Sequence, residues 1–373
     1  MTSKGKIHYN FDPVILTAVI LLVGIGLVAV YSAGSILAEQ RHGDHYYYLR
    51  KQLMFCLFGF LVMIIAKNIN YRLYRRFVYV FLVSSMILLA LLLVPRLATK
   101  VGGAQRWFRL GFISIQPSEI AKLSLAMFVA ASMQKNFENM GSFSRGLLPN
   151  LIAGSIVIGL ILLQPDLGTA VIIGMWILVL LFIGGVNLAQ LIAVLGIAAP
   201  ILYYLITQTA YRLNRLWAFL NPWEDPQGIG FQIIHSFLAF GSGGVLGVGL
   251  GNSKQKLLYL PEPHTDFILA IIAEEIGFIG VSALLILFAT VVIRGIKIAL
   301  RSPDLFGTYL AMGISCMLAI QVMVNMGVVM ALLPTKGLTL PFISYGGSSL
   351  IVNFVGIGIL MNISTKALEG TKK

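Results

Sequence analysis

A carboxylate at the start of an apolar run is the clearest candidate for chemistry in this sequence. The string HTDF, residues 264–267, closes a polar and glycine-rich segment, residues 208–267, and a long apolar run follows it directly. Most other connectors between apolar runs are short, so a connector of this length is the natural place for a reactive group. A carboxylate there, Asp266, can serve as a general base or as a metal ligand.

Three further apolar runs begin with polar strings of the same kind, QPSE (116–119), QPDLGT (164–169) and SYGGSS (344–349). Proline and acidic or hydroxyl residues are ordinary helix starts, so capping explains each string alone, including Asp166, which is also a candidate substrate contact. Four such starts on one face would present free N–H groups and positive dipole ends to a shared cavity. Such a cavity suits a phosphate group.

Other ionisable residues lie deeper in the apolar runs. Glu119 and Lys122 are three residues apart and share one helix face. At that depth charges normally find a partner, so the two form a structural ion pair or Lys122 reaches an anionic ligand. Glu274 and Glu275 follow Asp266 by eight and nine residues. At about 100° per residue, Glu274 can support the site, whereas Glu275 lies on the opposite face and is expected to pack or to contact a partner residue.

The composition of the chain requires a membrane. Of 373 residues, 58% are hydrophobic and 11% are charged, whereas soluble domains carry about 25% charged residues. Cys56 and Cys316 both fall in apolar runs and offer neither a disulfide framework nor a metal cluster. The first apolar run, 13–38, is longer than the core of a cleaved signal peptide and predicts a retained helix.

The apolar runs predict an all-α polytopic membrane protein with about ten transmembrane helices. No internal repeat, heptad pattern or low-complexity linker appears in the sequence, so we expect residues 1–373 to form a single domain. The predicted helices are 14–36, 52–66, 77–94, 118–134, 147–163, 168–186, 189–207, 267–293, 305–332 and 348–364.

The long segment 208–267 lies between the seventh and eighth predicted helices. Residues 211–217 are basic and amphipathic, as expected of a segment at the membrane surface. Residues 231–240 are apolar but too few to span, which favours an interfacial or re-entrant stretch. The glycine-rich run 241–251 lacks the spacing of a nucleotide P-loop, so we expect its glycines to permit sharp turns and close backbone approach.

Lysine and arginine in the connectors indicate the orientation. The side with both termini carries 14 of them, close to the ends of the spans, and the other side carries 12, mostly in the loops 95–117 and 208–267. We therefore expect both termini in the cytoplasm and the long segment outside. The positive charge outside has two explanations, an anionic ligand or contact with anionic lipid headgroups.

Eight ordered strings across nearly the whole chain resemble the SEDS family, the bacterial shape, elongation, division and sporulation proteins. They are GAQRW (103–107), QPSEIAK (116–122), QPDLGTA (164–170), NPWEDPQGIGFQ (221–232), AFGSGG (239–244), GLGNSKQKLLYLPEPHTDFI (249–268), AEEIG (273–277) and LPTKGLTLPFISYGGSSLI (333–351). Three segments within them, NPWEDP, LGNSKQKLLYLPE and PTKGLTLP, look closer to the division branch of the family than to the elongation branch.

This resemblance implies an inverting peptidoglycan glycosyltransferase of the bacterial cytoplasmic membrane, which polymerises lipid II outside and releases a polyprenol diphosphate. As partners it implies a class B penicillin-binding transpeptidase and other membrane proteins of the division machinery, and no nucleic acid. The essential catalytic aspartate of the family matches Asp266. The other functional positions of the family match Arg106, Trp107, Glu119, Lys122 and Lys336.

The chemistry can also be argued from residue types. Sugar transfer from a lipid diphosphate needs a base for the acceptor hydroxyl and positive charge for the departing diphosphate. Diphosphate is already a good leaving group, so no second carboxylate is needed as an acid, unlike in glycosidases. We therefore assign Asp266 as the base and Arg106, Lys122 and Lys336 as stabilisers of the diphosphate. A role of Asp266 as ligand of a divalent cation, Mg or Mn, stays open.

Three alternatives stay open. A lipid II flippase would place its polar groups near the membrane midplane on broken helices, often in symmetric halves, whereas here they gather at one face. A non-catalytic scaffold for a transpeptidase would be indicated if removing the charges of Asp266, Arg106 and Lys336 left activity intact and disrupted complex formation. Within the family, the alternative is an elongation-type polymerase.

Overall fold

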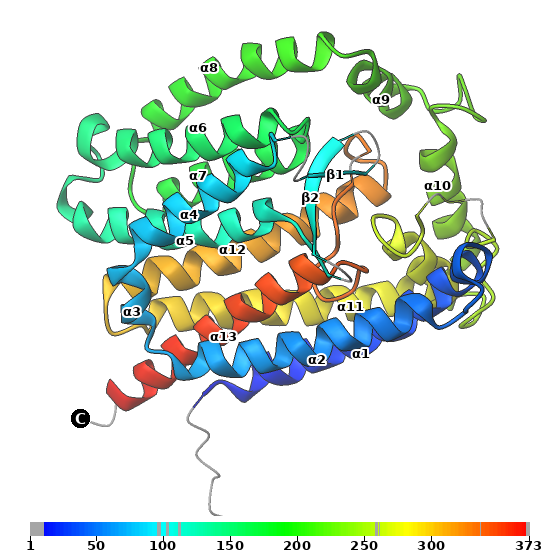
Figure 1. Ribbon diagram of the computed structural model, residues 1–373, viewed down its shortest axis with the longest axis horizontal. Helices are drawn as coiled ribbons and strands as arrows, with labels where there is room; N and C mark the ends of the chain where they lie inside the picture. Colours follow the sequence, from blue (N-terminus) through cyan, green and yellow to red (C-terminus); the bar gives the residue numbers. More distant parts are fainter. Residues whose placement is uncertain are drawn as a thin grey trace, which may run out of the picture.

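Ten long helices make up most of the computed structural model (Figure 1), which confirms the predicted all-α fold. The structure describes residues 11–94, 98–101, 104–110, 113–257, 260, 262–335 and 337–370. The long helices are α1 (Pro13–His42), α2 (Tyr47–Asn68), α4 (Val78–Leu91), α5 (Pro117–Lys135), α6 (Leu148–Leu162), α7 (Leu167–Ile183), α8 (Leu188–Thr207), α11 (Ile268–Leu300), α12 (Leu305–Val329) and α13 (Gly347–Gly370). Each overlaps one predicted helix.

Their lengths and side chains suit a membrane. Among the described residues, seven helices are long and apolar enough to cross one, and α4 and α7 are apolar but shorter. The remaining long helix, α5, has 19 residues and carries Glu119, Lys122 and Lys135. The chain is therefore a multi-span membrane protein, as its composition predicts.

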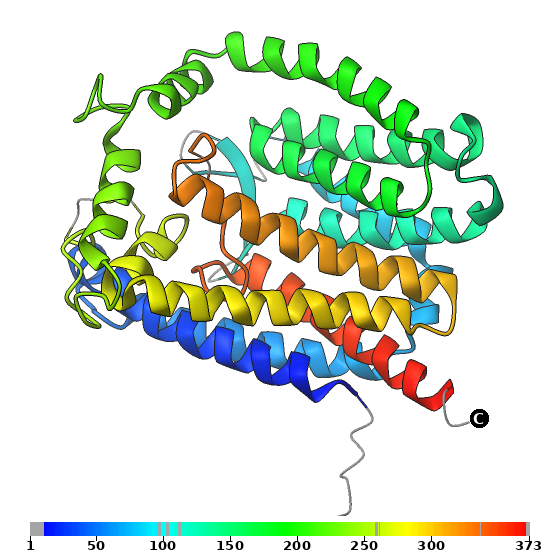
Figure 2. The ribbon, with the colours of Figure 1, turned by 180° about the vertical axis from the view of Figure 1, so that it is seen from behind.

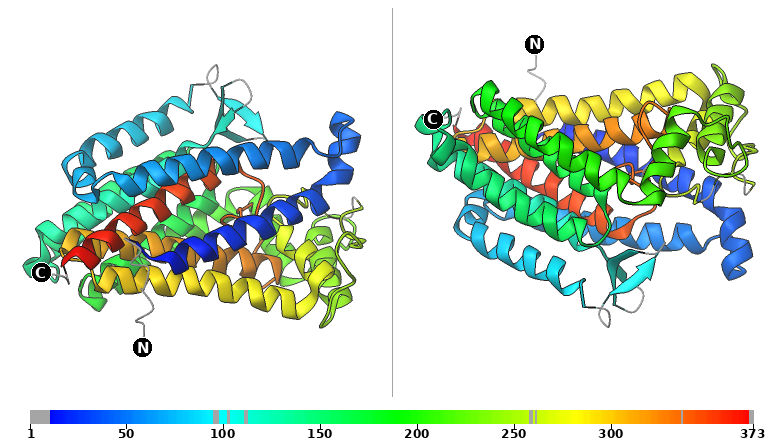
Figure 3. Two further views of the ribbon diagram at one scale, coloured as in Figure 1. Left: turned by 90° about the horizontal axis from the view of Figure 1, so that it is seen from below. Right: turned by 90° about the horizontal axis from the view of Figure 1, so that it is seen from above.

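The shorter elements lie in the connectors. They are α3 (Tyr71–Arg76), β1 (Thr99–Val101), β2 (Ala104–Leu110), β3 (Ile113–Ile115), a 3-10 turn (Phe137–Asn139), a π-helical turn (Phe143–Leu147), α9 (Ala210–Leu220) and α10 (Phe231–Gly243). The strands form an antiparallel sheet in the order β1-β2-β3. It stands beside one end of the bundle (Figure 3) and was not predicted. Helices α9 and α10 occupy the stretches expected to be amphipathic and interfacial.

Helix packing brings distant parts of the chain together. Helix α11 lies between α1 and α12 (Figure 2), and α2 packs along α13. Trp176 of α7 is fully buried, and its Nε1 donates a hydrogen bond to the Gly313 carbonyl of α12 at 2.8 Å. Helix α1 begins and α13 ends at the same end of the bundle (Figure 1). Chain ends at the same end of the bundle require an even number of spans, in agreement with the ten predicted helices and with the prediction that both termini lie on one side of the membrane.

Helix α11 is broken at Gly277, where φ is +66°, and the glycine-rich run fills the break. The N–H groups of residues 248–249 donate to the carbonyls of residues 274–275 at 2.9 and 3.0 Å. Beyond the break, the N–H groups of residues 278–279 donate to the carbonyls of residues 244–245 at 2.9 and 3.2 Å. The helix thus keeps backbone partners where its own ladder stops, which a low-dielectric medium requires. Close backbone approach of the run is confirmed.

Replacing Gly277 with alanine tests this break. A Cβ there would clash with the backbone N of Gly247 and would hold a side chain at positive φ. We expect Gly277→Ala to destabilise the fold by about 2 kcal/mol or more. Thermal unfolding in detergent, followed with a thiol-reactive dye on Cys56 and Cys316, would measure it, because both thiols lie within helices.

The matched control is Gly196→Ala. Gly196 is helical, and a Cβ there meets nothing within 4 Å. We expect a change within about 1 kcal/mol. Equal melting temperatures for Gly277→Ala and the unaltered protein would contradict the tight packing of the run against α11.

Candidate active site

The starts of α5, α7, α11 and α13 meet at one end of the bundle, as predicted. The Tyr345 N–H donates to the His264 carbonyl at 2.9 Å and so joins the starts of α13 and α11. The Gln116 N–H donates to Ser348 Oγ at 3.1 Å and joins α5 to α13. Arg106 of β2 reaches the start of α7. Four positive helix ends therefore face a common region.

Asp266 lies in the turn before α11, half-buried in this region. Its Oδ2 lies so close to Gly337 that a Cβ at that position would come within 2.8 Å of it. Asn325 of α12 donates through Nδ2 to the Asp266 carbonyl at 3.1 Å and to the Leu338 carbonyl at 2.6 Å. One buried amide thus holds the HTDF turn against the backbone at Leu338.

Ser344, from the predicted SYGGSS string, fixes the same two segments. Its Oγ donates to the Thr265 carbonyl at 2.7 Å and accepts from the Leu340 N–H at 2.8 Å. Gln52 of α2 donates through Nε2 to the Ser344 carbonyl at 3.2 Å. The backbone around Asp266 is therefore positioned by side chains from α2, α12 and the start of α13.

The surroundings of Asp266 raise its pKa to about 7, chiefly because burial disfavours the charged carboxylate. Arg215 and Arg106 oppose this shift, and the negative charges of Glu262 and Asp166 add to it. Among the described residues, none donates a hydrogen bond to the carboxylate. A carboxylate with a pKa near neutrality accepts a proton more readily than an ordinary aspartate, which is what a general base requires.

Arg106 is held by backbone carbonyls at the start of α7. Its guanidinium donates to the Gln164 carbonyl at 3.3 Å and to the Pro165 carbonyl, and Nε lies 3.9 Å from Asp166 Oδ2. Asp166 itself accepts from the N–H and Oγ1 of Thr169 at 3.2 and 2.9 Å. Asp166 is therefore an N-cap of α7, in agreement with the capping interpretation. Its role as a substrate contact stays a prediction.

Arg215 is a residue that the sequence analysis missed. It belongs to α9, which was expected only to lie at the membrane surface. Its Nη1 donates to the Thr335 carbonyl at 3.1 Å, and its guanidinium stacks 4.5 Å from the ring centre of Tyr211. Its positive charge is the strongest influence that lowers the pKa of Asp266. The one signal in the sequence was its position in the same long segment as Asp266.

Two predicted residues flank this group. Trp107 follows Arg106 on β2 and is half-buried, with Thr99 of β1 as its strand partner. Lys336 lies outside the described residues, although Thr335 and Gly337 on either side are described. The structure thus brings together Asp266, Arg106 and Asp166 of the predicted set and adds Arg215.

Glu119 and Lys122 form an ion pair inside the bundle. Lys122 Nζ lies 2.8 Å from Glu119 Oε1, and both residues are less than a tenth exposed. They line a cavity of about 30 Å³ with Gln321 and Asn353, large enough for a water molecule. Gln321 Oε1 is buried without a partner among the described residues, and Asp266 is not part of this lining. A structural ion pair accounts for these contacts, and contact of Lys122 with a ligand stays a prediction.

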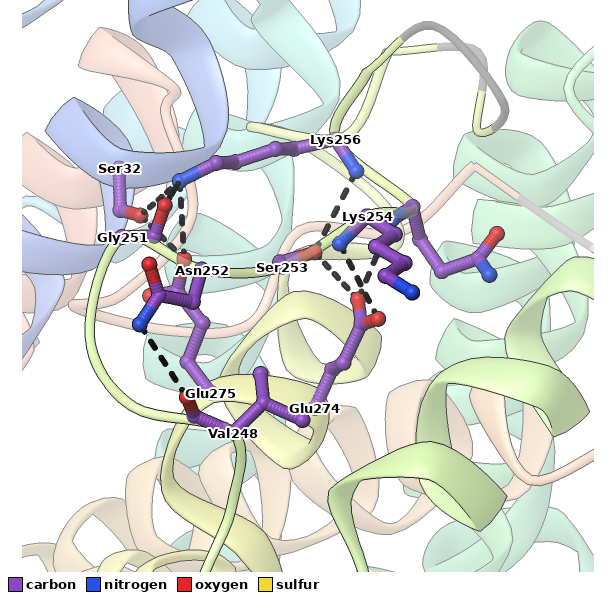
Figure 4. Close-up of polar contacts among 10 residues, drawn as sticks. Ser32, Val248, Gly251, Asn252, Ser253, Lys254, Lys256, Glu274 and Glu275 are labelled. Carbon is purple, nitrogen blue, oxygen red and sulfur yellow. Dashed lines mark hydrogen bonds and ion pairs between the residues drawn. The ribbon is translucent and has the colours of Figure 1, made fainter.

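Glu274 holds the loop that leads to the HTDF turn (Figure 4). Its carboxylate accepts from Ser253 Oγ and from the N–H groups of residues 254–255 at 3.1 and 3.2 Å. Glu274 is therefore a positioning residue that supports the site through the loop backbone.

Glu275 was expected to pack or to contact a partner residue, and it does both, because it is buried in an ionic contact. Its Oε1 lies 3.1 Å from Lys256 Nζ and accepts from Ser32 Oγ of α1 at 2.5 Å (Figure 4). Lys256 also donates to the Gly251 carbonyl at 2.6 Å. This contact fastens the loop to α1 and α11 together.

His264 packs in the protein interior and is only 2% exposed. Its ring stacks on Tyr48 with 4.1 Å between ring centres. Burial lowers the pKa of His264 to about 4, so the imidazole is neutral at physiological pH.

The described residues do not fit a protein-held cation at Asp266. Among them, no three His, Cys, Asp or Glu side chains gather into a metal site. The acidic neighbours of Asp266 are engaged elsewhere, since Asp166 caps α7 and Glu262 pairs with Arg41 at 2.9 Å. The described residues thus give no support to a divalent cation held by the protein, and the cation stays a prediction. Asp266 can act as a base without it.

Comparison with known proteins gives matches along nearly the whole chain. Residues 13–369 match a family of cell cycle proteins defined by FtsW, RodA and SpoVE. The chain is 47% identical over 357 residues to the probable peptidoglycan glycosyltransferase FtsW of Geobacter sulfurreducens, with 96% of each chain covered. It is 42% identical over 364 residues to the stage V sporulation protein E of Bacillus subtilis, covering 98% of this chain and 99% of that protein.

Solved structures share the fold. A chain from a peptidoglycan synthase complex, described as coordinating polymerization and crosslinking, superposes with a TM-score of 0.79 at 29% identity, covering 96% of this chain and 98% of that one. The rod shape determining protein RodA of Thermus thermophilus gives a TM-score of 0.68 at 29% identity, covering 95% of this chain and 96% of that one.

The raised pKa of Asp266 predicts an effect on stability. The folded protein binds this proton more tightly than the unfolded chain, in which the carboxyl titrates near 3.8. Stability therefore falls as the pH rises from about 4 to about 7 and stays reduced above that. We expect Asp266→Asn to melt about 2 °C or more above the unaltered protein at pH 8, with a smaller difference at pH 5.

Asp304→Asn is the control with the opposite sign. Burial would raise the pKa of Asp304, but hydrogen bonds from Tyr71, the Gly307 N–H and Arg72 outweigh it and lower that pKa. Asp304→Asn should therefore melt below the unaltered protein at pH 8. Should Asp266→Asn also melt lower at every pH, its carboxylate stabilises the fold and the desolvation argument is wrong.

Proposed function

The chain belongs to the FtsW, RodA and SpoVE family of cell cycle proteins, and we propose that it is the peptidoglycan glycosyltransferase that polymerises lipid II at the division septum. The observation that carries this proposal is the half-buried carboxylate of Asp266, with a pKa of about 7, within the field of two arginines. A base and fixed positive charges are the two requirements of glycosyl transfer from a diphosphate. FtsW relatives at 47% identity support the division role.

In the proposed reaction, an acceptor sugar hydroxyl attacks C1 of the donor sugar. The bond between C1 and the diphosphate oxygen breaks, and a new C1–O bond forms with inverted configuration. The hydroxyl proton passes to Asp266, and the polyprenol diphosphate leaves with the electron pair of the broken bond. The diphosphate is stable as an anion, so Asp266 alone supplies the proton transfer. The proton is lost to solvent before the next cycle.

Arg106 and Arg215 are suited to the negative charge that develops on the diphosphate. Their guanidinium groups donate to backbone carbonyls, which fix their positions without adding negative charge, and the nearest carboxylate oxygen to Arg106 is Asp166 Oδ2 at 3.9 Å. Positive groups that are fixed before the reaction stabilise a developing charge without a cost of reorganisation. Lys336 and Lys122 are proposed to add to this field, and Trp107 beside Arg106 is proposed to stack on a sugar ring.

We place the protein in the bacterial inner membrane with both termini cytoplasmic and Asp266 on the outer side. A class B penicillin-binding transpeptidase is the proposed partner, together with other membrane proteins of the division machinery. Similarity to a chain from a complex that coordinates polymerization and crosslinking supports this partner. A cross-linking partner on the same face would receive the glycan strand where it is made.

One observation favours the transporter alternative. The break of α11 at Gly277 is a feature of transporters, whose substrates bind at interrupted helices. In this protein the glycine-rich run fills the break with backbone hydrogen bonds. Lipid II flipped across vesicles without glycan synthesis would favour transport, whereas glycan strands made by purified protein in detergent, where no membrane separates two sides, require polymerase activity.

Asp266→Asn should abolish polymerisation. Loss of a general base costs about 10²- to 10⁴-fold in rate, so we expect at least about a 100-fold loss of glycan synthesis from lipid II. The assay uses purified full-length protein with and without the partner transpeptidase and resolves glycan length on gels. Glu224→Gln is the control, because Glu224 is an exposed carboxylate in the same long segment. Full activity of Asp266→Asn would remove Asp266 from the mechanism.

The pH dependence should report the pKa of Asp266. As a base it must be deprotonated, so kcat/KM should rise with pH through about 7 and level off above, instead of being flat from pH 5. Arg215 lowers that pKa, so Arg215→Ala should move the rise to higher pH. A shift of the profile separates this effect from weaker substrate binding, which lowers the rate at every pH. An unchanged profile in Arg215→Ala would contradict the assignment.

A further inference from the structure

A second cavity lies at the end of the bundle away from Asp266. Helix α5 begins next to α13 in the Asp266 region and ends at Lys135, and the cavity opens there. It measures about 670 Å³ and lies between the start of α4, the end of α5 and the start of α6. The side chains that matter for the argument are those of Arg75, Tyr79, Phe128, Lys135, Ser144 and Arg145.

Three cationic side chains line the cavity, and none of them forms an ion pair with a described carboxylate. Arg75, Lys135 and Arg145 are exposed, and no described carboxylate lies within 4.0 Å of them. Arg75 donates through Nη1 to the neutral Gln134 Oε1 at 3.2 Å. At the same end, by contrast, Arg72 pairs with Asp304 at 2.8 Å. The lining residues include no aspartate or glutamate, so the cavity is a concentrated positive site.

Helix starts add to this charge. Helix α4 begins at Val78, which lines the cavity, and the continuous helix Phe143–Leu162 begins with Ser144 and Arg145 in its first turn. The first N–H groups of a helix lack partners within the helix and carry its positive dipole end. Both starts therefore favour an anion with several acceptor oxygens, such as a phosphate.

Aromatic residues place the cavity at the level of lipid headgroups. Tyr79 lines the cavity and is 67% exposed, and Phe137 and Phe143, which adjoin the lining residues Asn136 and Ser144 in sequence, are 52% and 54% exposed. Exposed aromatic rings next to lysine and arginine at the ends of spans are typical of the membrane interface. Phe128 meets Tyr79 edge to face, with 5.9 Å between ring centres, and forms an apolar wall on one side.

We propose that this cavity binds the phosphate headgroup of an anionic phospholipid of the surrounding membrane. The three cations and the helix starts contact the phosphate oxygens, and the aromatic wall packs against the glycerol and the first carbons of the acyl chains. Basic pockets between helices at the cytoplasmic side bind headgroups in this way. The site is far from Asp266 and does not depend on the proposed polymerase activity.

Native mass spectrometry of the full-length protein tests the site. The protein is released from nanodiscs of equal parts phosphatidylglycerol and phosphatidylcholine, and the retained lipids are counted. The unaltered protein should retain phosphatidylglycerol preferentially. Replacing Arg75, Lys135 and Arg145 with glutamine should reduce this preference by about tenfold or more.

The matched control replaces Arg76, Lys297 and Arg301 with glutamine. These three cations lie at the same end, are exposed, and do not line the cavity. The change in charge is identical to that of the first triple variant, but the cavity is unaltered. The preference for phosphatidylglycerol should therefore persist. Equal loss in both triple variants would overturn the proposal in favour of general surface attraction, and no preference for phosphatidylglycerol in the unaltered protein would overturn it outright.

Cysteine labelling gives a test that does not depend on the triple variant folding. Ser144→Cys places a thiol in the lining, and Ser142→Cys places one beside it, where Ser142 is exposed and not part of the lining. Phosphatidylglycerol nanodiscs should slow maleimide labelling of Ser144→Cys, and not of Ser142→Cys, relative to phosphatidylcholine nanodiscs. Equal protection of both thiols, or of neither, would refute the site.

A free phosphate is distinguished in the same assay. Millimolar inorganic phosphate should leave the labelling of Ser144→Cys in phosphatidylcholine nanodiscs unchanged. Protection by inorganic phosphate equal to that by phosphatidylglycerol would overturn the lipid proposal and assign the cavity to a soluble anion.

Discussion

Desolvation of one carboxylate is the constraint on which the site depends. Asp266 is half-buried with its Oδ2 against Gly337, and this burial is the main reason that its pKa rises to about 7. A charged group without hydrogen-bond donors is costly to bury, so the surrounding backbone must hold it there. Asn325 and Ser344 do so by bonding the carbonyls next to it. The charged form of Asp266 is destabilised, so the carboxylate accepts a proton readily. The hydrogen bonds of the neighbouring side chains compensate for the free energy that this burial costs.

Those contacts show why so many polar side chains lie on apolar helices. Asn325 of α12 and Gln52 of α2 bond loop carbonyls, and Glu274 collects the N–H groups of the loop before the HTDF turn. In a low-dielectric medium an unpaired polar group is costly, so each of these side chains strongly favours one loop position. The loops at this end of the bundle are therefore positioned by the helices, although they carry little regular structure of their own.

The sequence predicts the helices well because membrane length and uniform hydropathy determine them locally. It also predicts that four polar helix starts converge, since alternating spans return to the same side. It does not predict β1 and β3, whose three residues are too few to show alternation. It misses the break in α11, because one glycine at 277 inside an apolar run is equally compatible with a straight helix. Arg215 was missed because its partner, Thr335, is 120 residues away.

The arginines of this protein are held in two ways. Away from the site, Arg72 and Arg294 each face an aspartate, at 2.8 and 2.5 Å. In the site, Arg215 bonds a carbonyl oxygen, which holds its guanidinium in place and leaves its net charge intact, and Arg106 bonds two carbonyls with Asp166 Oδ2 as far as 3.9 Å away. That charge remains to lower the pKa of Asp266 and to attract an anion. These fixed charges favour the first of the two explanations for the positive charge in the loops 95–117 and 208–267, an anionic ligand, over scattered contacts with headgroups.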